Sequence, residues 1–295
     1  MAISLVKAST PRKLLSAAAA LGAAATLALW GGAGTGAAAA VPTPSHVVVV
    51  VLENHAYSQV IGSSSAPYIN SLATGGANLT QFYAETHPSQ PNYYAMFSGG
   101  TQGITGDACV TIGFSSAANL GSELIAAGKT WASYNEGLPS QGSTACTSSG
   151  GKYAQKHNPW FGFKNVPTST ARTMAQFPTD FTTLPKVSFV VPNLCNDMHD
   201  CSVSTGDGWL KSKLGAYATW AKSNNSLLVV TFDEDNRLAG NRVATVVYGQ
   251  PVIPGSKPST TYNHYNLLRT LEDMAGLTTH AGNAASASAI TGIWS

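Results

Sequence analysis

The chain has 295 residues, and only 10% are charged, 16 Lys or Arg against 14 Asp or Glu, where an average soluble domain has about 25%. Hydrophobic residues make up 44%, yet no apolar run of about 20 residues could cross a bilayer, and the aromatic and aliphatic content is too high for a disordered chain. Basic residues form no cluster, which excludes a nucleic-acid-binding surface.

Residues 1–40 are expected to be a secretory signal. Three basic residues precede an apolar Ala/Leu-rich stretch, Leu14–Trp30, and small residues ending at Ala40 are typical of a cleavage site. An uncleaved anchor is the alternative, although Ala-rich segments insert weakly. Residues 41–295 then form a single secreted domain with no stable membrane insertion, and loss of three of the 16 cations moves its net charge from +2 to −1.

Short apolar runs alternate with helical segments along the rest of the chain, a pattern typical of an α/β fold with a largely parallel sheet. The expected strands are Val47–Leu52, Thr130–Tyr134, Val187–Val191, Leu227–Phe232 and Val243–Tyr248. The expected helices are Pro91–Phe97, Leu120–Ala127, Trp209–Ser223 and Tyr265–Met274. The unbroken apolar run of the first strand indicates burial on both faces of the sheet.

All four cysteines lie beyond the predicted signal, at Cys109, Cys146, Cys195 and Cys201. Export favours disulfides, and four cysteines allow three pairings. The last two cysteines are close enough in sequence to staple one loop, which leaves the first two to pair. A zinc site is the alternative, but no Cys-x-x-Cys spacing is present.

Polar side chains follow three of the predicted strands at the point where each ends. These segments are Glu53-Asn54-His55, Asn196-Asp197-Met198-His199-Asp200 and Asp233-Glu234-Asp235-Asn236. Because ligands in open α/β sheets bind beyond the carboxyl ends of the strands, we expect the three segments to meet at one edge. They contain six of the fourteen acids, which is a strong concentration in so poorly charged a chain.

The strand-end oxygen donors predict a divalent metal site, because carboxylates that point at one spot repel unless a cation lies between them. The candidate ligands are Glu53, Asn54, Asp233 and Glu234. Oxygen ligands favour Ca²⁺, Mg²⁺ or Mn²⁺. The alternative is that Asp and Asn cap helices, which remains open for Asp235 and Asn236.

Ser89 precedes a helix that Pro91 is suited to begin. Its hydroxyl could cap that helix or act as a metal-activated nucleophile, and the local sequence alone favours the cap. His87, His199 and His264 stand in polar motifs at strand or helix ends, which indicates charge stabilisation or proton transfer. His157 is expected in a loop.

Six motifs in order resemble the phosphoesterase family of bacterial acid phosphatases and phosphatidylcholine-type phospholipases C, over roughly His46 to Trp294. The motifs are Glu53-Asn54-His55, His87-Pro88-Ser89-Gln90-Pro91-Asn92-Tyr93, Lys156-His157-Asn158-Pro159, Asn196-Asp197-Met198-His199-Asp200, Asp233-Glu234-Asp235 and His264-Tyr265-Asn266-Leu267-Leu268. They are most similar to a branch of secreted mycobacterial acid phosphatases that act on phosphatidylinositol 3-phosphate.

The resemblance implies a three-layer α/β/α sandwich like that of alkaline phosphatases. It also implies one divalent metal ion bound by Glu53, Asn54, Ser89, Asp233 and Glu234. Ser89 becomes the nucleophile, which reverses the capping interpretation. Asn54, His87, His199 and His264 are expected around the phosphoryl group, with Asp197 supporting His199.

The expected function is that of a secreted, metal-dependent acid phosphatase that hydrolyses soluble or lipid phosphomonoesters through a phosphoserine. One alternative is phosphodiester cleavage of phospholipids at the same site. Another is a secreted metal-dependent glycan-binding protein, which would have no need of a nucleophile. A sulfatase is disfavoured, because the Cys/Ser-x-Pro-x-Arg context is missing.

Overall fold

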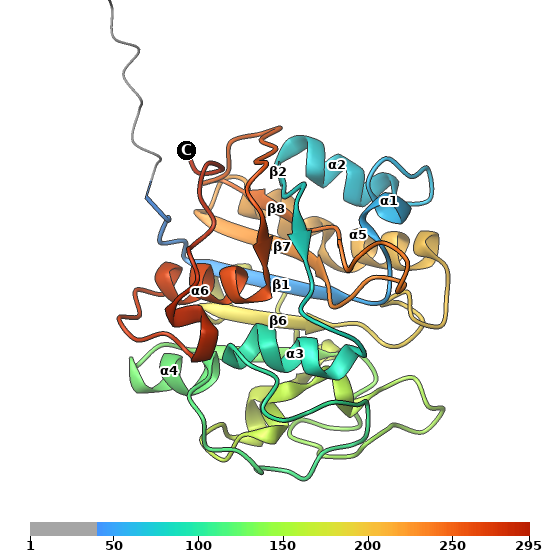
Figure 1. Cartoon of the computed structure of the whole chain (residues 1–295), viewed down its shortest axis with the longest axis vertical. Coiled ribbons are helices and arrows are strands. Elements are labelled where there is room, and N and C mark those ends of the chain that lie inside the picture. The colour runs from blue at the N-terminus through green and yellow to red at the C-terminus, as the bar shows by residue number, and fades with distance from the viewer. Residues whose placement is uncertain (1–39) are drawn as a thin grey trace, which may run out of the picture. The chain divides into compact units, whose positions relative to one another are not determined.

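A seven-stranded sheet, mostly parallel, runs through the centre of the computed structural model, which describes residues 40–295 (Figure 1). In sheet order its strands are β2 (Ala77–Asn78), β8 (Val246–Gly249), β7 (Ser226–Phe232), β1 (His46–Leu52), β6 (Val187–Val191), β4 (Trp131–Asn135) and β5 (Ala171–Thr173). Strand β8 is antiparallel to both of its neighbours, β7 and β2, and the other pairs of this sheet are parallel. All of the predicted secretory signal except Ala40 lies outside the described residues.

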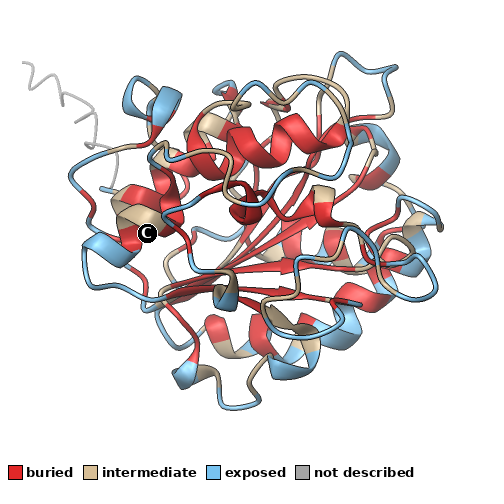
Figure 2. Ribbon diagram, turned by 90° about the horizontal axis from the view of Figure 1, so that it is seen from below, coloured by how far each residue is buried: buried red, intermediate tan, exposed pale blue. Residues whose placement is uncertain are grey.

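Helices cover both faces of this sheet, and a small parallel pair joins β3 (Phe82–Tyr83) to β9 (Tyr262–Asn263) beside it. On one face α2 packs on β8 and β2 and α5 packs on β7 and β8, and on the other α3 packs against α6 and α4. Figure 2 shows helices on both faces of the sheet. The helices are α1 (Tyr57–Val60), α2 (Pro67–Gly75), α3 (Ser89–Ser98), α4 (Leu120–Ala126), α5 (Val203–Ala221) and α6 (His264–Met274). The predicted three-layer α/β/α architecture is therefore confirmed.

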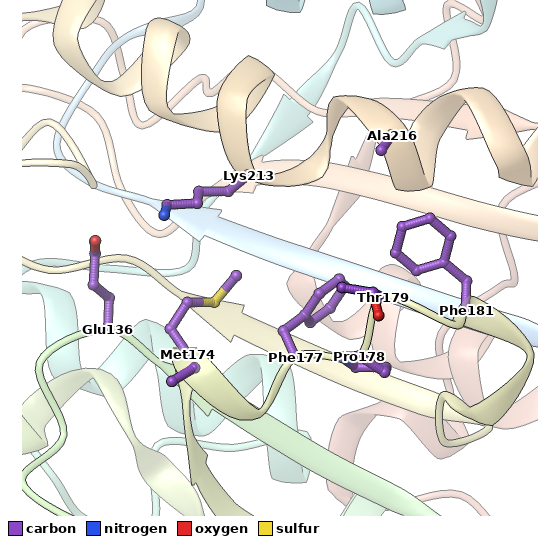
Figure 3. Close-up of a pocket in the computed structure, with 9 residues that line it drawn as sticks. Glu136, Met174, Phe177, Pro178, Thr179, Phe181, Lys213 and Ala216 are labelled. Carbon is purple, nitrogen blue, oxygen red and sulfur yellow. The ribbon is translucent and has the colours of Figure 1, made fainter.

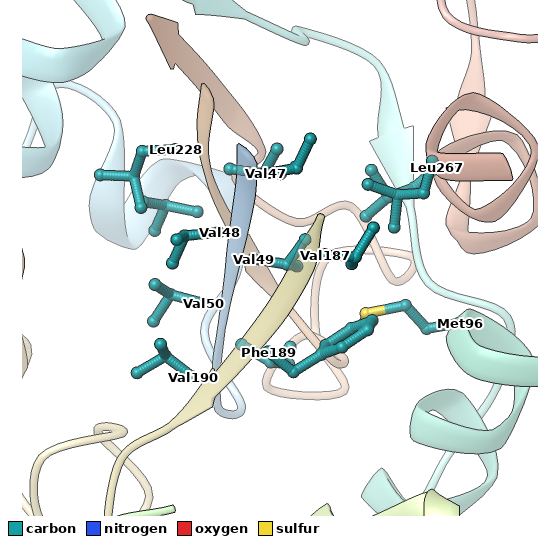
Figure 4. Close-up of a cluster of buried hydrophobic side chains, with 14 of the residues drawn as sticks. Val47, Val48, Val49, Val50, Met96, Val187, Phe189, Val190, Leu228 and Leu267 are labelled. Carbon is teal, nitrogen blue, oxygen red and sulfur yellow. The ribbon is translucent and has the colours of Figure 1, made fainter. Parts of the chain in front are cut away.

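The valine run of β1 forms the middle of the core. Its side chains alternate between the two faces, so Val48 and Val50 lie on one side of the sheet and Val49 on the other, with Met96 of α3 and Leu267 of α6 (Figure 4). All three valines are fully buried. A strand covered on both faces has no solvent side for polar residues, which is why its sequence is continuously apolar.

Several predicted elements differ from the structure by one or two residues at an end, and two differ by more. The last predicted strand, Val243–Tyr248, is shorter, and it runs antiparallel as β8 at Val246–Gly249. Helix α5 begins before the expected Trp209, because the hydroxyl of Ser202 accepts the backbone N–H of Thr205 and starts the helix there. The apolar residues at helical spacing on which the predicted start rested, Leu210, Leu214 and Tyr217, are buried and mark only the later part of this helix.

Both predicted disulfides are present. Cys109 bonds to Cys146 with their Cα atoms 5.5 Å apart, and Cys195 bonds to Cys201 with a Cα separation of 4.7 Å. No thiol is left to bind zinc, so that alternative is wrong. Among residues 40–295, no helix is both long and apolar enough to cross a bilayer.

Two carboxyl groups lie close together between α4 and α6. Glu123 on α4 is partly buried and Glu272 on α6 is fully buried, and the charge of Glu123 acts on Glu272. Burial penalises the charged form and raises the pKa of each carboxyl above the ordinary value of 4.5. The pair therefore retains a proton that an unfolded chain would release near pH 4.5.

We expect Glu272→Gln to be more stable than the wild type at pH 8, by on the order of 1–2 kcal/mol, and to lose this advantage at pH 4. A carboxyl with a raised pKa contributes stability that is complete below the unfolded value of 4.5 and is lost as the pH rises towards the folded value. An amide does not ionise and escapes that loss. Urea unfolding at both pH values measures the difference, with Asp180→Asn, at an exposed carboxylate, as the control. If the variant were no more stable than the wild type at pH 8, the pKa of Glu272 would not be raised by burial.

Candidate active site

Side chains from three strands and one helix converge at the carboxyl edge of the sheet. Glu53 follows β1, Asp233 and Glu234 follow β7, and Ser89 is the first residue of α3. The Ser89 hydroxyl donates to Glu53 Oε2 at 2.9 Å and lies 3.3 Å from Glu234 Oε1. Asp197, in the loop after β6, joins this group through its carbonyl, which accepts the backbone N–H of Glu53 at 2.8 Å. The expected meeting of the three strand ends is confirmed.

The Asn92 side chain holds Ser89 in place from inside helix α3. Its Oδ1 accepts the backbone N–H groups of Glu85 and Thr86, each at 3.0 Å, and its Nδ2 donates to the carbonyls of Thr86 and Pro88. The segment that leads into α3, from Glu85 to Pro88, is therefore held by Asn92, three positions beyond Ser89. The Ser89 side chain makes no capping bond and points to the carboxylates.

Burial and mutual repulsion act on the carboxylates more strongly than the positive charge of Lys156 does. Glu53, Asp197 and Asp233 are completely buried, and burial raises the pKa of each above its ordinary value. Repulsion from Glu53 raises the pKa of both aspartates further. Asp197 Oδ2 and Asp233 Oδ2 are also buried without a hydrogen-bond donor. Unpaired anionic oxygens at this depth fit a divalent cation, which would offset both the burial and the repulsion.

Asn54 completes the set of oxygen-bearing side chains. Its backbone is in the left-handed region, with φ of 56°, a conformation that Asn tolerates better than most residues. The turn directs its backbone N–H to Asp233 Oδ1 at 3.2 Å and its amide Nδ2 to Glu53 Oε2 at 3.0 Å. Among the described residues no three His, Cys, Asp or Glu side chains are already grouped as a metal centre. The hydroxyl of Ser89 and the amide of Asn54 bridge the carboxylates instead.

His199 is the histidine that faces the cavity at this edge. The cavity has a volume of about 350 Å³ and is lined by Asn54, Pro88, Ser89, Asp107, His199, Glu234, Asp235, Asn236 and Arg237. The Nδ1 atom of His199 lies 2.7 Å from Asp200 Oδ1. Asp197 was expected to support His199, and it does so only through the backbone, accepting its N–H at 2.8 Å. Asp200, which the sequence interpretation did not assign, orients the ring.

The other two predicted histidines lie behind the cavity wall. His87 Nδ1 is 2.5 Å from Glu234 Oε2 and its Nε2 is 3.4 Å from Asp235 Oδ1. His264 is completely buried, its Nε2 donates to the Asp233 carbonyl at 2.8 Å, and burial lowers its pKa to about 4. Both side chains therefore brace the acids that follow β7. Direct contact of either histidine with a phosphoryl group stays a prediction.

His157 and Tyr93 were not predicted as site residues, yet both contact Glu53. Tyr93 Oη donates to Glu53 Oε1 at 2.7 Å, and His157 Nε2 lies 3.0 Å from the same oxygen. The two rings are stacked with their centroids 4.9 Å apart. Burial and the charges of Lys156 and His199 lower the pKa of His157 well below its ordinary value. Because His157 is a buried part of the site, its interpretation as a simple loop residue is incomplete.

Asp235 shapes the loop at the cavity rim. Its carboxylate accepts the backbone N–H groups of Arg237, Ala239 and Asn241 at 2.6, 2.7 and 3.0 Å. The interpretation that Asp235 and Asn236 cap a helix is therefore wrong, because no helix follows and the carboxylate binds the backbone of a loop instead. Asn236 similarly accepts the N–H of Leu238 at 3.3 Å.

Asp107 and Lys156 close the opposite side of the cavity. Asp107 Oδ1 accepts the backbone N–H of Gln90 at 3.0 Å, and its Oδ2 lies 3.0 Å from Lys156 Nζ. Lys156 also lowers the pKa of Glu53, so its charge reaches the buried acids. Nothing in the spacing of the sequence pointed to Asp107, because its role depends on the disulfide-linked loop folding back over α3.

Comparison with known proteins identifies the relatives of this chain. The model of the Phosphoesterase family matches residues 63–278. A phosphatidylinositol-3-phosphatase of Mycobacterium tuberculosis is 50% identical over 277 residues, which cover 92% of this chain and 91% of that protein. A probable acid phosphatase of Kluyveromyces lactis is 31% identical over 257 residues, covering 80% of this chain and 60% of the fungal protein.

Solved structures with low sequence identity share the fold. A protein in the alkaline phosphatase superfamily from Vibrio parahaemolyticus has a TM-score of 0.59 at 13% identity, over 81% of this chain and 68% of that one. Murine ectonucleotide pyrophosphatase/phosphodiesterase 5 has a TM-score of 0.53 at 12% identity, over 82% of this chain and 99% of that one. The expected alkaline-phosphatase-like fold is confirmed. With a family match over most of its length and a relative of 50% identity, the chain belongs to the phosphoesterase family.

Proposed function

We propose that this phosphoesterase is a metal-dependent phosphomonoesterase that works through a covalent phosphoserine. The observation that carries the proposal is the placement of Ser89. Its buried hydroxyl stands at the first residue of α3, hydrogen-bonded to Glu53 and on the wall of the cavity that His199 also lines. A nucleophile, a cluster of acids and an oriented histidine around one cavity are the parts that phosphoryl transfer requires.

Glu53, Asn54, Asp233 and Glu234 are the side chains that would hold the metal ion, with Ser89 beside them. A bound divalent cation would supply positive charge to the phosphoryl oxygens and lower the pKa of the Ser89 hydroxyl. The backbone N–H of Ser89 at the start of α3 and the Asn54 amide would hold the remaining phosphoryl oxygens.

In the first step Ser89 Oγ bonds to phosphorus as the bond from phosphorus to the leaving oxygen breaks. The hydroxyl proton moves towards Glu53 Oε2, to which it is already hydrogen-bonded. Protonated His199 gives its Nε2 proton to the leaving oxygen, while Asp200 holds the other ring nitrogen. In the second step His199 takes a proton from water, and the water oxygen bonds to phosphorus as the bond from phosphorus to Ser89 Oγ breaks. Ser89 Oγ recovers its proton from Glu53, and inorganic phosphate is released.

The proposed substrate is phosphatidylinositol 3-phosphate, because the half-identical Mycobacterium tuberculosis relative is a phosphatidylinositol-3-phosphatase. An acidic optimum is proposed as well, since His199 must be protonated to act on the leaving oxygen. Two disulfides are consistent with secretion into an oxidising environment.

The test is release of inorganic phosphate from p-nitrophenyl phosphate and from phosphatidylinositol 3-phosphate. Release of a phosphorylated headgroup instead would favour phosphodiester cleavage. Failure to turn over any phosphoester, with retained glycan binding, would favour the binding-protein alternative.

His199→Gln is expected to affect substrates according to their leaving groups. We expect kcat/KM for an alkyl phosphate to fall by about 100-fold, and that for p-nitrophenyl phosphate by less than about tenfold, because nitrophenolate departs without a proton. Steady-state kinetics on both substrates measure the difference, with His46→Gln as a control at a histidine that contacts Pro185 away from the site. Equal losses on the two substrates would assign His199 to binding rather than to proton donation.

A further inference from the structure

A second cavity, of about 530 Å³, is mainly apolar and lies between helix α5 and the segment Met174–Phe181 (Figure 3). We propose that it binds an acyl chain of a lipid phosphomonoester substrate. This inference rests on the proposed function and extends it by assigning a separate subsite to the lipid tail. The apolar lining comes from Met174, Phe177, Pro178, Phe181 and Ala216.

The aromatic side chains of this apolar groove are held rigidly by neighbouring rings. Phe177 packs edge-on against Tyr134 with centroids 5.0 Å apart, and Phe181 packs against Tyr217 at 5.4 Å and Trp220 at 5.7 Å. Phe177 and Phe181 nevertheless remain partly exposed along the groove. A preformed apolar surface of this volume suits an extended hydrocarbon, because it gains contact area without rearrangement.

The charged side chains of the groove, Glu136 and Lys213, lie at one end only, and that end lies at the catalytic edge of the sheet. Glu136 and Lys213 lie at the end towards which the strand arrows point, and Phe181 lies at the other end (Figure 3). Glu136 directly follows β4, which is two strands from β1 in the sheet and therefore about 10 Å from it. A phosphorylated ring and its phosphodiester link are long enough to bridge such a gap.

Hydrogen bonds connect the polar end of the groove to the loop that carries His199. Glu136 Oε2 accepts the Asn196 amide at 2.8 Å and the backbone N–H of Asn193 at 3.1 Å, and its Oε1 accepts Trp209 Nε1 at 3.0 Å. The Glu136 carboxylate is thus occupied by protein donors. Lys213 is exposed and lies beside it, so the charge offered to a ligand at this end is positive.

An amphiphile with an anionic head and an apolar tail matches this arrangement. Lys213 would pair with the phosphodiester that links the headgroup to glycerol, and the acyl chain would extend along the groove towards Phe181. The monoester phosphate, one headgroup further on, would then reach the cavity that contains Ser89. A glycan, which lacks a hydrocarbon chain, or a polar peptide would leave the apolar lining of the groove exposed to water.

Filling the groove tests the proposal. Ala216→Phe is expected to raise KM at least about tenfold for dihexadecanoyl phosphatidylinositol 3-phosphate in detergent micelles. The same variant should keep wild-type kinetics, within about twofold, on dibutanoyl phosphatidylinositol 3-phosphate and on p-nitrophenyl phosphate, neither of which has a long acyl chain to place along the groove. Ser212→Phe is the matched control, an exposed α5 position outside the groove. The proposal would be overturned if KM for the long-chain lipid rose equally in both variants, or if it did not rise in Ala216→Phe.

A binding measurement separates the groove from the catalytic proposal. A lysophospholipid with a brominated acyl chain should quench the fluorescence of Trp220, which packs on Phe181. The quenching should disappear in Trp220→Phe and in Ala216→Phe. Quenching in a protein that hydrolyses no phosphomonoester would refute the proposed function and leave the groove supported. Turnover without quenching or chain-length dependence would refute the groove alone.

Discussion

Ser89→Ala is expected to lower kcat on every phosphomonoester by at least about a thousand-fold, because the variant has no atom that can form the covalent intermediate. The buried carboxylates and the proposed metal site remain, so substrate binding should survive. In the wild type, acid quenching during turnover should trap one phosphoryl group on the peptide that contains Ser89, detectable by mass spectrometry. The variant should show no such adduct.

The matched control for this experiment is Ser98→Ala. Ser98 lies on the same helix and is also buried, but its hydroxyl donates to the carbonyl of Tyr94 and does not contact the acids. Loss of that hydroxyl should cost a little stability and no more than about twofold in rate. If Ser89→Ala retains turnover comparable to that of Ser98→Ala, the nucleophile is not Ser89.

The layers of the fold could be predicted because the core strands carry a strong local signal. Five consecutive valines in β1 are compatible only with a strand covered on both faces, and the observed helices cover both faces. The antiparallel direction of β8 could not be predicted, since alternation and burial are the same for either direction. Helix α2 was missed, although Pro67 at its first position is a usable start signal.

The candidate site was predictable where its residues directly follow strands. Glu53 and Asp233 stand at that position, and parallel neighbours bring their strand ends together without further information. Asp200 and His157 were harder, because their contacts depend on loop conformation rather than on periodicity. The Asp200 carboxylate reaches its neighbour His199 only in the turn that the Cys195–Cys201 disulfide closes.

Metal removal is expected to abolish activity. After dialysis against a chelator, the rate on p-nitrophenyl phosphate should fall below about 1% of its original value, because the charge of Lys156 alone does not offset several buried acids beside a phosphate dianion. Addition of Ca²⁺, Mg²⁺ or Mn²⁺ in separate samples should restore it and identify the effective ion. An unchanged rate in the metal-free protein would remove the metal from the mechanism.

Asp233→Asn is expected to be more stable than the wild type without metal and less stable than the wild type with metal. Without metal at pH 7.5, Asp233→Asn should unfold at a higher temperature than the wild type, since it removes one of the mutually repelling buried acids, and Oδ1 can still accept the N–H of Asn54. With saturating metal the wild type should gain about 5 °C or more in Tm, because a cation at a hundred times its Kd contributes about 2.7 kcal/mol. The variant lacks one of the carboxylates that would coordinate the cation, so its Tm should rise much less and should fall below that of the wild type. Asp180→Asn, at an exposed carboxylate, should follow the wild type in both conditions. Only a cation held among these carboxylates produces such a reversal, whereas a purely structural Asp233 would leave the variant less stable in both.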